Sequence, residues 1–328
     1  MNAKPLVSIV IPNYNYSRFL DERFRSILEQ GCEGCEIIFL DDASSDDSVQ
    51  VARERYGQYI DHFEVNETNT GSPFVQWNRG ARIARGEFLW VAEADDVCAP
   101  GFLKKMLRAL SASPRIGLAY CTTVPIDTNG DVLDAGFHHR YMSDLDTSRW
   151  NHDFTANGRE EVQGYLGRKN TITNASGVVF RREAYVQAGY APEHMRMCGD
   201  WLAYCRILEN WDVAFVAEPL NYHRQHPTKQ TNKSVMNLTY FEEFAAVQDY
   251  VAGHFGLTGA QRDEAFRRFV GEWDRHTVSH LGRIDLRGTF ALAGVCARYY
   301  RTPAQRLRTL KHLAQNSIKT LGMKWASR

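Results

Sequence analysis

Two groups of carboxylates stand in the first hundred residues, each directly after a short apolar segment. The first group is Asp41 and Asp42, and the second is the Glu-Ala-Asp-Asp of residues 93–96. Carboxylate oxygens are natural ligands of Mg²⁺ or Mn²⁺, which are typically held by one or two protein carboxylates together with substrate phosphates. Residues two apart on an extended chain point the same way, which predicts that Glu93 and Asp95 share one ligand. The pattern therefore predicts a divalent-cation site.

Each acidic group also has an ordinary structural explanation. Asp41 and Asp42 precede a helical segment and would cap its N-terminus, and residues 93–96 would form a solvated loop before Pro100. A third acid, Asp200, precedes another helical segment, so capping would explain it as well. It is also a candidate general base, which needs only to reach a substrate hydroxyl. Two acidic strand ends in one sheet favour the chemical interpretation over the structural one.

The segments around the first two acidic groups alternate between strand and helix patterns. Short apolar, β-branched runs predict strands at residues 6–11, 36–40, 63–65 and 87–92. Apolar residues at helical spacing lie between them, at residues 19–30, 48–56 and 75–85. This alternation indicates an α/β fold of β-α-β units, with a mostly parallel sheet flanked by helices. Ligands of such sheets bind beyond the carboxyl ends of the strands, which is where both acidic groups stand.

The rest of the chain changes character near residue 235. Before that point we expect helices at 102–111 and 201–210, strands at 117–124, 177–180 and 213–216, and a loop-rich stretch up to residue 158. From about residue 237 the apolar spacing becomes continuously helical. We therefore predict an α/β domain over residues 1–235, followed by an all-α region over residues 236–328.

Composition excludes several classes of protein. The 328 residues include 44% hydrophobic residues, 39 basic and 39 acidic residues, and these balanced charges indicate no nucleic-acid partner. No run reaches the roughly 18 apolar residues of a membrane span, and the start does not resemble a signal peptide. Seven cysteines without metal-site spacing suit a reducing compartment. We therefore expect a cytoplasmic protein.

The charge is unevenly distributed along the chain. Residues 298–328 contain eight basic residues and no acidic residue. Their helical pattern, with leucines between the basic residues, predicts a basic amphipathic helix that contacts the inner face of the cell membrane. The alternatives are a helix packed against the acidic remainder of the chain or against a partner chain in a homo-oligomer.

Four motifs, taken together, carry a family resemblance. They are V-S-I-V-I-P-N-Y-N at 7–15, D-D-A-S-S-D-D at 41–47, A-R-G-E-F-L-W-V-A-E-A-D-D at 84–96 and G-D-W at 199–201. In this order and spacing they resemble the family 2 glycosyltransferases, which are inverting enzymes of the GT-A (Rossmann-like) fold. The resemblance covers about residues 5–230. It implies a nucleotide-diphosphate sugar as donor and a hydroxyl of a glycan or lipid-linked oligosaccharide as acceptor.

The resemblance also implies which residues bind the nucleotide. Pro12 and Tyr14 would line the base, with Tyr14 stacking on it. Asp42 would bind the base or ribose edge while Asp41 supports the turn. Glu93 and Ala94 would complete the nucleotide contacts.

Further roles follow from the same resemblance for the reacting groups. Asp95, assisted by Glu93, would hold Mg²⁺ or Mn²⁺ on the diphosphate, where the ion stabilises the charge of the leaving group. Asp200 would be the base that takes the proton of the acceptor hydroxyl in a single displacement with inversion.

Two other segments resemble parts of the same family. Residues 222–231 resemble a loop that closes over the donor, where His226, Arg224 or Lys229 would neutralise the diphosphate; the alternative is a solvated basic loop that joins two domains. Residues 174–182 resemble an acceptor-side strand, which together with the G-D-W motif would place Ser176 and Trp201 beside the acceptor. Plain β structure explains Ser176 equally well.

Three positions depart from the common family pattern. Glu93 stands where the usual D-x-D begins, Gln-Trp-Asn at 76–78 replaces Ala-Arg-Asn, and Gly199 replaces a frequent Glu. The departures resemble a subgroup associated with bacterial surface polysaccharides such as lipopolysaccharide or capsule. Two alternatives stay open: a non-catalytic nucleotide-sugar or glycan-binding relative, and a sugar nucleotidyltransferase. The latter would need a G-x-G-x-R loop after the first strand, where Pro-Asn-Tyr-Asn stands.

Overall fold

The computed structural model describes residues 4–31, 33–226, 238–281 and 286–300, together with 305, 307 and 311. The chain divides into two compact units. The first comprises residues 1–161 and 170–226, and the second comprises residues 162–169 and 227–328. The predicted domain boundary at residue 235 lies outside the described residues.

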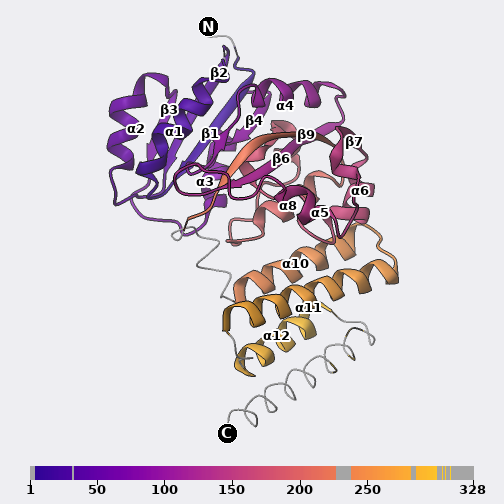
Figure 1. Cartoon of the computed structure of the whole chain (residues 1–328). Helices are drawn as coiled ribbons and strands as arrows, with labels where there is room; N and C mark the ends of the chain where they lie inside the picture. The colour runs from indigo at the N-terminus through magenta and orange to yellow at the C-terminus, as the bar shows by residue number, and fades with distance from the viewer. Residues whose placement is uncertain are drawn as a thin grey trace. The chain divides into compact units, whose positions relative to one another are not determined.

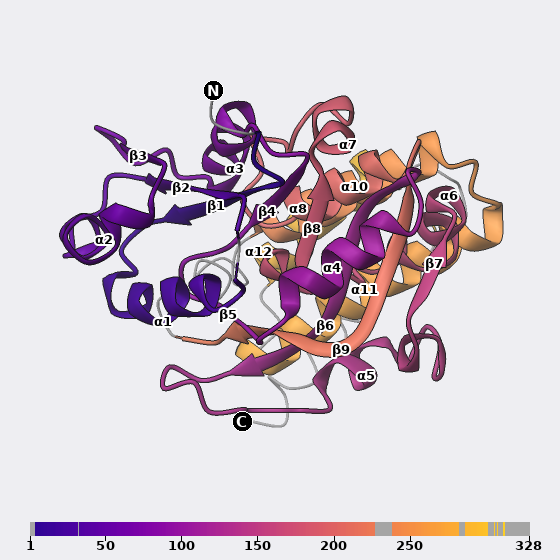
Figure 2. The ribbon, with the colours of Figure 1, turned by 90° about the horizontal axis from the view of Figure 1, so that it is seen from above.

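The first unit is built around one sheet, which Figures 1 and 2 show from two directions. Its strands are β1 (Val7–Asn13), β2 (Cys35–Asp41), β3 (His62–Val65), β4 (Phe88–Val91), β5 (Val97–Cys98), β6 (Ile116–Ile126), β7 (Phe154–Ala156), β8 (Val178–Arg181) and β9 (Asp212–Arg224). Their spatial order is β3-β2-β1-β4-β8-β6-β9-β5, and β7 pairs with β9. The first four strands in this order run parallel, as predicted. Strand β8 is antiparallel to both β4 and β6, so β6, and with it β9, runs in the same direction as the first four strands; the sheet is mostly parallel with antiparallel members.

The helices agree closely with the apolar spacing of the sequence. They are α1 (Ser17–Leu28), α2 (Ser48–Tyr56), α3 (Pro73–Ile83), α4 (Phe102–Ser111), α5 (Phe137–Met142), α6 (Gly158–Glu161), α7 (Arg182–Gln187), α8 (Gly199–Ile207), α10 (Leu238–His254), α11 (Gly259–Leu281) and α12 (Leu286–Tyr299). The bounds predicted for α2 and α4 are those observed. The predicted α/β organisation and the helical C-terminal region are confirmed.

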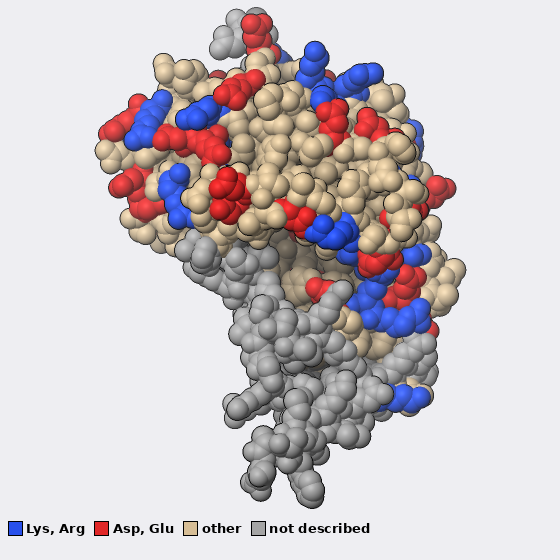
Figure 3. Space-filling view, viewed as in Figure 1, with Lys and Arg blue, Asp and Glu red and all other residues tan. Residues whose placement is uncertain are grey.

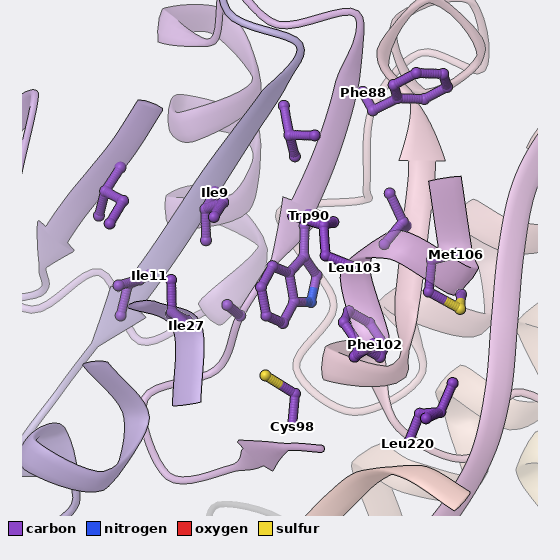
Figure 4. Packing of buried hydrophobic residues seen from close by; sticks show 14 of the residues in the cluster. Ile9, Ile11, Ile27, Phe88, Trp90, Cys98, Phe102, Leu103, Met106 and Leu220 are labelled. Atoms are coloured by element: carbon purple, nitrogen blue, oxygen red, sulfur yellow. The ribbon is translucent and has the colours of Figure 1, made fainter. Parts of the chain in front are cut away.

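Strand β1 shows how helices cover both faces of the sheet, with α1 and α3 on opposite sides (Figure 2). Ile9 and Ile11 belong to a core cluster that includes Ile27 of α1, and they lie on that side in Figure 4. Val10 points to the other face, where it packs against Gly80 of α3. A Cβ on Gly80 would lie only 2.4 Å from Val10 Cγ1, so glycine lets α3 approach the sheet closely.

The largest difference from the sequence-based prediction lies between residues 120 and 224. The predicted loop-rich stretch contains α5 and β7, and the short strand predicted at 213–216 is the start of the 13-residue β9. Strand β9 pairs with β6 through several register shifts. These irregularities break the regular alternation of side chains that a sequence pattern can reveal.

The second unit is helical, and aromatic contacts between α10 and α11 fill its interior. The ring of Phe241 lies edge-on to Trp273, with centroids 4.8 Å apart, and Phe244 packs edge-on against Phe269. Among the helices in the described part of the chain, none is both long enough and apolar enough to cross a membrane.

Figure 3 shows acidic and basic side chains interspersed over the face in view.

Candidate functional site

The carboxyl ends of β1, β2 and β4 form one edge of the sheet. Asn13 is aligned with Asp41 across the parallel pair β1–β2, and Ala92 N, just after β4, donates a 2.8 Å hydrogen bond to Val10 O of β1. Both predicted acidic groups therefore begin at the same edge, the usual place for a ligand site in an α/β sheet.

Asp41 is buried and stabilises the turn after β2. Its Oδ2 accepts hydrogen bonds from Asn13 Nδ2 and Ser44 Oγ, both at 2.7 Å, and its Oδ1 accepts one from Ser44 N at 2.8 Å. Within this turn Ala43 has a left-handed backbone with φ of 61°, which costs a non-glycine residue about 1–2 kcal/mol. The hydrogen bonds of Asp41 offset part of this cost and support its predicted role in the turn.

Asp42 anchors the loop between β3 and α3. Its Oδ1 accepts hydrogen bonds from Asn66 Nδ2 at 2.7 Å and from Gln76 Nε2 at 3.0 Å. Its Oδ2 accepts one from Thr70 Oγ1 at 2.9 Å, and Thr70 N lies 3.1 Å from both oxygens. With these bonds made and only 6% of the residue exposed, Asp42 mainly orders the loop that surrounds it.

The other predicted nucleotide contacts differ in exposure. Tyr14 follows β1 and is 45% exposed, so its ring is available for stacking. Pro12 is buried within β1, opposite Leu40 of β2. Ala94 is fully buried and its methyl group belongs to the hydrophobic core. Any contact of Ala94 with a nucleotide would therefore come from its main chain.

The chain after β4 forms a tight turn instead of the extended segment assumed above. Asp96 N donates to Glu93 O at 3.2 Å. Glu93 Oε1 accepts a 2.7 Å hydrogen bond from Trp77 Nε1 on α3, whereas Asp95 Oδ2 lies 3.0 Å from His226 Nε2. The expectation that Glu93 and Asp95 point the same way was wrong, because the chain turns between them.

Asp96 ties this turn to two other parts of the fold. Its Oδ2 accepts hydrogen bonds from Ser176 Oγ at 2.7 Å and Asn174 Nδ2 at 3.0 Å, and its Oδ1 accepts one from Arg224 N at 2.9 Å. Ser176 Oγ also accepts from Glu93 N at 3.1 Å. Ser176 is fully buried, so the expectation that it meets an acceptor was wrong; its hydroxyl supports the turn.

His226 lies directly on Asp95 and is surrounded by aromatic rings. The two residues are 2% and 4% exposed, respectively. The imidazole is edge-on to Tyr16 and tilted against Phe19, with ring centroids 5.3 Å apart in both cases. This packing fixes the position of the imidazole relative to the carboxylate of Asp95.

Arg224 has a supporting position in place of the predicted contact with a diphosphate. It is fully buried, and its Nε donates to Asp95 O at 2.8 Å while its Nη1 donates to Asp127 O at 2.9 Å. Its guanidinium also pairs with Glu22. The expectation for Arg224 was wrong, because these bonds direct its guanidinium group into the protein interior. Lys229 lies outside the described residues.

Tyr16 is a site residue that the sequence analysis missed. Burial raises the pKa of its phenol well above the usual value, and the negative charges of Asp95, Glu93 and Asp96 raise that pKa further. The phenol therefore stays protonated next to the acidic turn. The available signal was its position, two residues after Tyr14.

Asp200 lies in the first turn of α8 and is half-buried. Its Oδ1 accepts a 2.7 Å hydrogen bond from Trp201 N, and Asn170 Nδ2 lies 3.5 Å from its Oδ2. Asp200 is not the N-cap of this helix, since that position is Cys198 and no side chain among the described residues caps the helix end. Trp201 is only 2% exposed, so the expectation that its indole faces an acceptor was wrong: the ring is part of the core.

Asp95 and His226 fit a divalent cation. Adjacent ligands of an octahedral ion with bonds of about 2.1 Å lie roughly 3.0 Å apart, which is the distance between Asp95 Oδ2 and His226 Nε2. Within the described ranges no three His, Cys, Asp or Glu residues group as a metal site. Phosphate oxygens and water would therefore complete the coordination, as is common for Mg²⁺.

Solved structures with a similar fold are TarS of S. aureus in complex with UDP-GlcNAc and the mannosyltransferase PcManGT of Pyrobaculum calidifontis in complex with GDP-Man and Mn²⁺. TarS has a TM-score of 0.66 and 15% identity, over 90% of this chain and 80% of that one. PcManGT has a TM-score of 0.53 and 16% identity, over 98% of this chain and 88% of that one. These likenesses show the GT-A fold.

Sequence comparison is more specific. An uncharacterised glycosyltransferase of Nostoc sp. is 31% identical over 303 residues, which cover 85% of this chain and 88% of the relative. The model of the glycosyl transferase family 2 matches residues 8–187, more than half of the chain. The chain therefore belongs to glycosyl transferase family 2.

Proposed function

We propose that this glycosyltransferase moves a sugar from a nucleotide diphosphate to a hydroxyl of a glycan or lipid-linked oligosaccharide. The observation that carries the proposal is the shared edge of β1, β2 and β4, from which Tyr14, Asp42 and Asp95 all emerge. The complexes of TarS with UDP-GlcNAc and of PcManGT with GDP-Man and Mn²⁺ support a nucleotide-sugar donor.

The donor would bind along this edge. The exposed ring of Tyr14 stacks on the base, and the loop ordered by Asp42 borders the ribose. Asp95 and His226 would hold Mg²⁺ or Mn²⁺ for the diphosphate. When bound, such an ion stabilises the negative charge that develops on the leaving group.

The acceptor hydroxyl would attack the anomeric carbon from the opposite side. A new C–O bond forms as the bond between the sugar and the diphosphate breaks, so the configuration inverts. Asp200 takes the proton of the attacking hydroxyl, since its half-buried carboxylate is accessible from solvent. The nucleoside diphosphate leaves with the electron pair of the broken bond.

A donor screen tests the proposal. Purified protein with Mn²⁺ or Mg²⁺ is incubated with UDP-, dTDP- and GDP-sugars, with and without membrane lipid extract, and released nucleoside diphosphate is measured. We expect one donor to be consumed, with activity lost on chelation. Asp200→Asn should reduce turnover by at least about 100-fold, in the range found for loss of acid–base catalysis.

Asp131→Asn is the matched control, because Asp131 is exposed on a loop outside the site. It should retain full turnover. Nucleotide binding without turnover of any donor in the presence of lipid extract would instead support a non-catalytic relative. Absence of nucleotide binding would contradict the site itself.

The cellular setting is a further part of the proposal. We propose that the acceptor belongs to a bacterial surface polysaccharide, and that residues 298–328 bring the enzyme to the inner face of the membrane. Most of these residues lie outside the described ones, and the proposal rests on their eight basic residues. Sedimentation with anionic vesicles tests the membrane contact. A measurement of the molar mass in solution would detect a homo-oligomer.

A further inference from the structure

Helix α3 connects Glu93 to the start of α8. Trp77 Nε1 donates a 2.7 Å hydrogen bond to Glu93 Oε1. The indole of Trp77 packs edge-on against the ring of Phe74, with centroids 5.1 Å apart. Phe74 in turn fills the space over Gly199, where a Cβ would lie 2.4 Å from the ring. A continuous chain of contacts therefore runs from the carboxylate of Glu93 to the residue that precedes Asp200.

Glu93 and Asp95 thus serve different sides of the site. Asp95 is almost completely buried against His226, while Glu93 is half-buried. Burial raises the pKa of the Tyr204 phenol, and the charges of both Asp200 and Glu93 raise it further. The buried phenol of Tyr204 therefore stays protonated.

The position before Asp200 offers no side chain to a ligand. Gly199 lies beneath Phe74, and any larger residue there would collide with the ring. In the proposed reaction the transferred sugar lies between the diphosphate, next to Asp95, and the base Asp200. Glu93 stands two residues before Asp95 and is linked through Trp77 and Phe74 to the residue before Asp200. Its carboxylate is a strong acceptor for sugar hydroxyls.

We infer that Glu93 binds hydroxyl groups of the donor sugar instead of the metal ion, and that Trp77 is the residue that positions it. This inference rests on the proposed function. Trp77 holds one carboxylate oxygen in place, so the orientation of the other is restricted. The Trp77–Glu93 pair then contributes to the choice of sugar, while Asp95 and His226 serve the diphosphate.

Binding measurements with two ligands test the inference. Wild type, Glu93→Gln, Trp77→Phe and Asp95→Asn are titrated in Mn²⁺ with UDP and GDP, and with the sugar nucleotide that wild type prefers in the donor screen. Glu93→Gln should weaken binding of the sugar nucleotide about tenfold, as expected for loss of a charged hydrogen bond. Its Kd for the free nucleoside diphosphate, and its Mn²⁺ requirement, should change less than about twofold.

Trp77→Phe should show the same selective loss, because the carboxylate is no longer held. The matched control is Trp211→Phe, which removes an indole hydrogen bond to Gln187 at a distant surface position. It should leave both affinities unchanged. Glu87→Gln, at the amino end of β4, is the corresponding control for Glu93.

Two results would overturn the inference. If Glu93→Gln weakened the free diphosphate and raised the Mn²⁺ requirement as Asp95→Asn does, Glu93 would be a metal ligand. If it left both affinities unchanged, Glu93 would not contact the donor at all. A wild-type protein that bound no nucleoside diphosphate would refute the proposed function itself, a result distinct from either of these.

Discussion

Several side chains at the site point into the protein interior and hold other residues of the site in position. The carboxylates of Asp41 and Asp96 are each about 1% exposed and accept hydrogen bonds from three groups of the surrounding turns. Leaving such a buried donor or acceptor unpaired costs about 1–3 kcal/mol. These residues keep Tyr14 and Asp95 in place, and their loss would change the geometry of the site without removing any contact to a ligand.

At this scale we predict that His226 contributes to metal affinity. His226→Ala should raise the Mn²⁺ concentration needed for half-maximal nucleotide binding at least about tenfold, the loss typical of groups around a metal site. The measurement is a Mn²⁺ titration at fixed nucleotide concentration. His223→Ala is the matched control, since His223 lies three residues earlier and contacts Gln225. Equal Mn²⁺ requirements for both variants would remove His226 from the coordination.

Helix α5 illustrates how an element can carry a charge-sensitive core position. His138 on α5 is 1% exposed and stacks on Phe215 of β9 at an interplanar angle of 8°. Burial lowers the pKa of His138 to about 4. Neither ring nitrogen has a hydrogen-bond partner among the described residues. The imidazole is therefore neutral in the folded protein at neutral pH.

The pH dependence of stability follows from this position. Above a pH of about 6.5 His138 is neutral in both states and has no effect. As the pH falls from about 6.5 to about 4, the unfolded chain binds a proton that the folded chain does not. The free energy of unfolding therefore decreases over this range, by an amount on the order of 3 kcal/mol. His138→Phe should flatten the melting temperature against pH over this window. An unchanged slope would show that other groups dominate.

At the scale of the whole molecule, the two units are joined by more than one connection. Residues 162–169 interrupt the first unit and belong to the second. Gln163 Nε2 donates to Phe255 O at 2.6 Å, and Arg168 pairs with Glu264 at 3.3 Å. Val162 and Leu166 are fully buried. This segment therefore depends on helices that follow it by almost a hundred residues.

A protein shortened to residues 1–226 should accordingly be poorly soluble. Removing α10 and α11 takes away most of the unit to which the buried Val162 and Leu166 belong, and each such side chain contributes about 1.5–3 kcal/mol when buried. The prediction is checked by measuring the solubility and the oligomeric state of the shortened protein. Val162→Ser with Leu166→Ser should improve its solubility but destabilise the full chain. A monomeric, soluble fragment without these changes would contradict the prediction.

The parts of the fold with regular spacing were predictable from the sequence. The strands before the two acidic groups and the helices α2 and α4 have clear periodic patterns, and parallel β-α-β units bring strand ends together without further information. The family motifs added Asp200, which has no local signal beyond a helix start.

Contacts between distant residues were not predictable in the same way. Asp95 and His226 are 131 positions apart, and nothing in either segment indicates their pairing. Ser176 and Trp201 stand in motifs, but a motif does not say whether a side chain faces a ligand or the core. Arg224 is an equally clear case, because both the resemblance to a donor-covering loop and the alternative of a solvated loop implied an exposed side chain, whereas Arg224 is buried. Burial depends on the whole packed unit, not on the neighbouring residues.

The placement of residues 162–169 has a consequence for the exchange of parts between related enzymes. A chimera that joins the first 226 residues of this chain to the helices of a relative would combine an inserted segment from one parent with partners from the other. Productive recombination would need three breakpoints, near residues 161, 169 and 226. The second unit would therefore have to be exchanged together with residues 162–169, which belong to it.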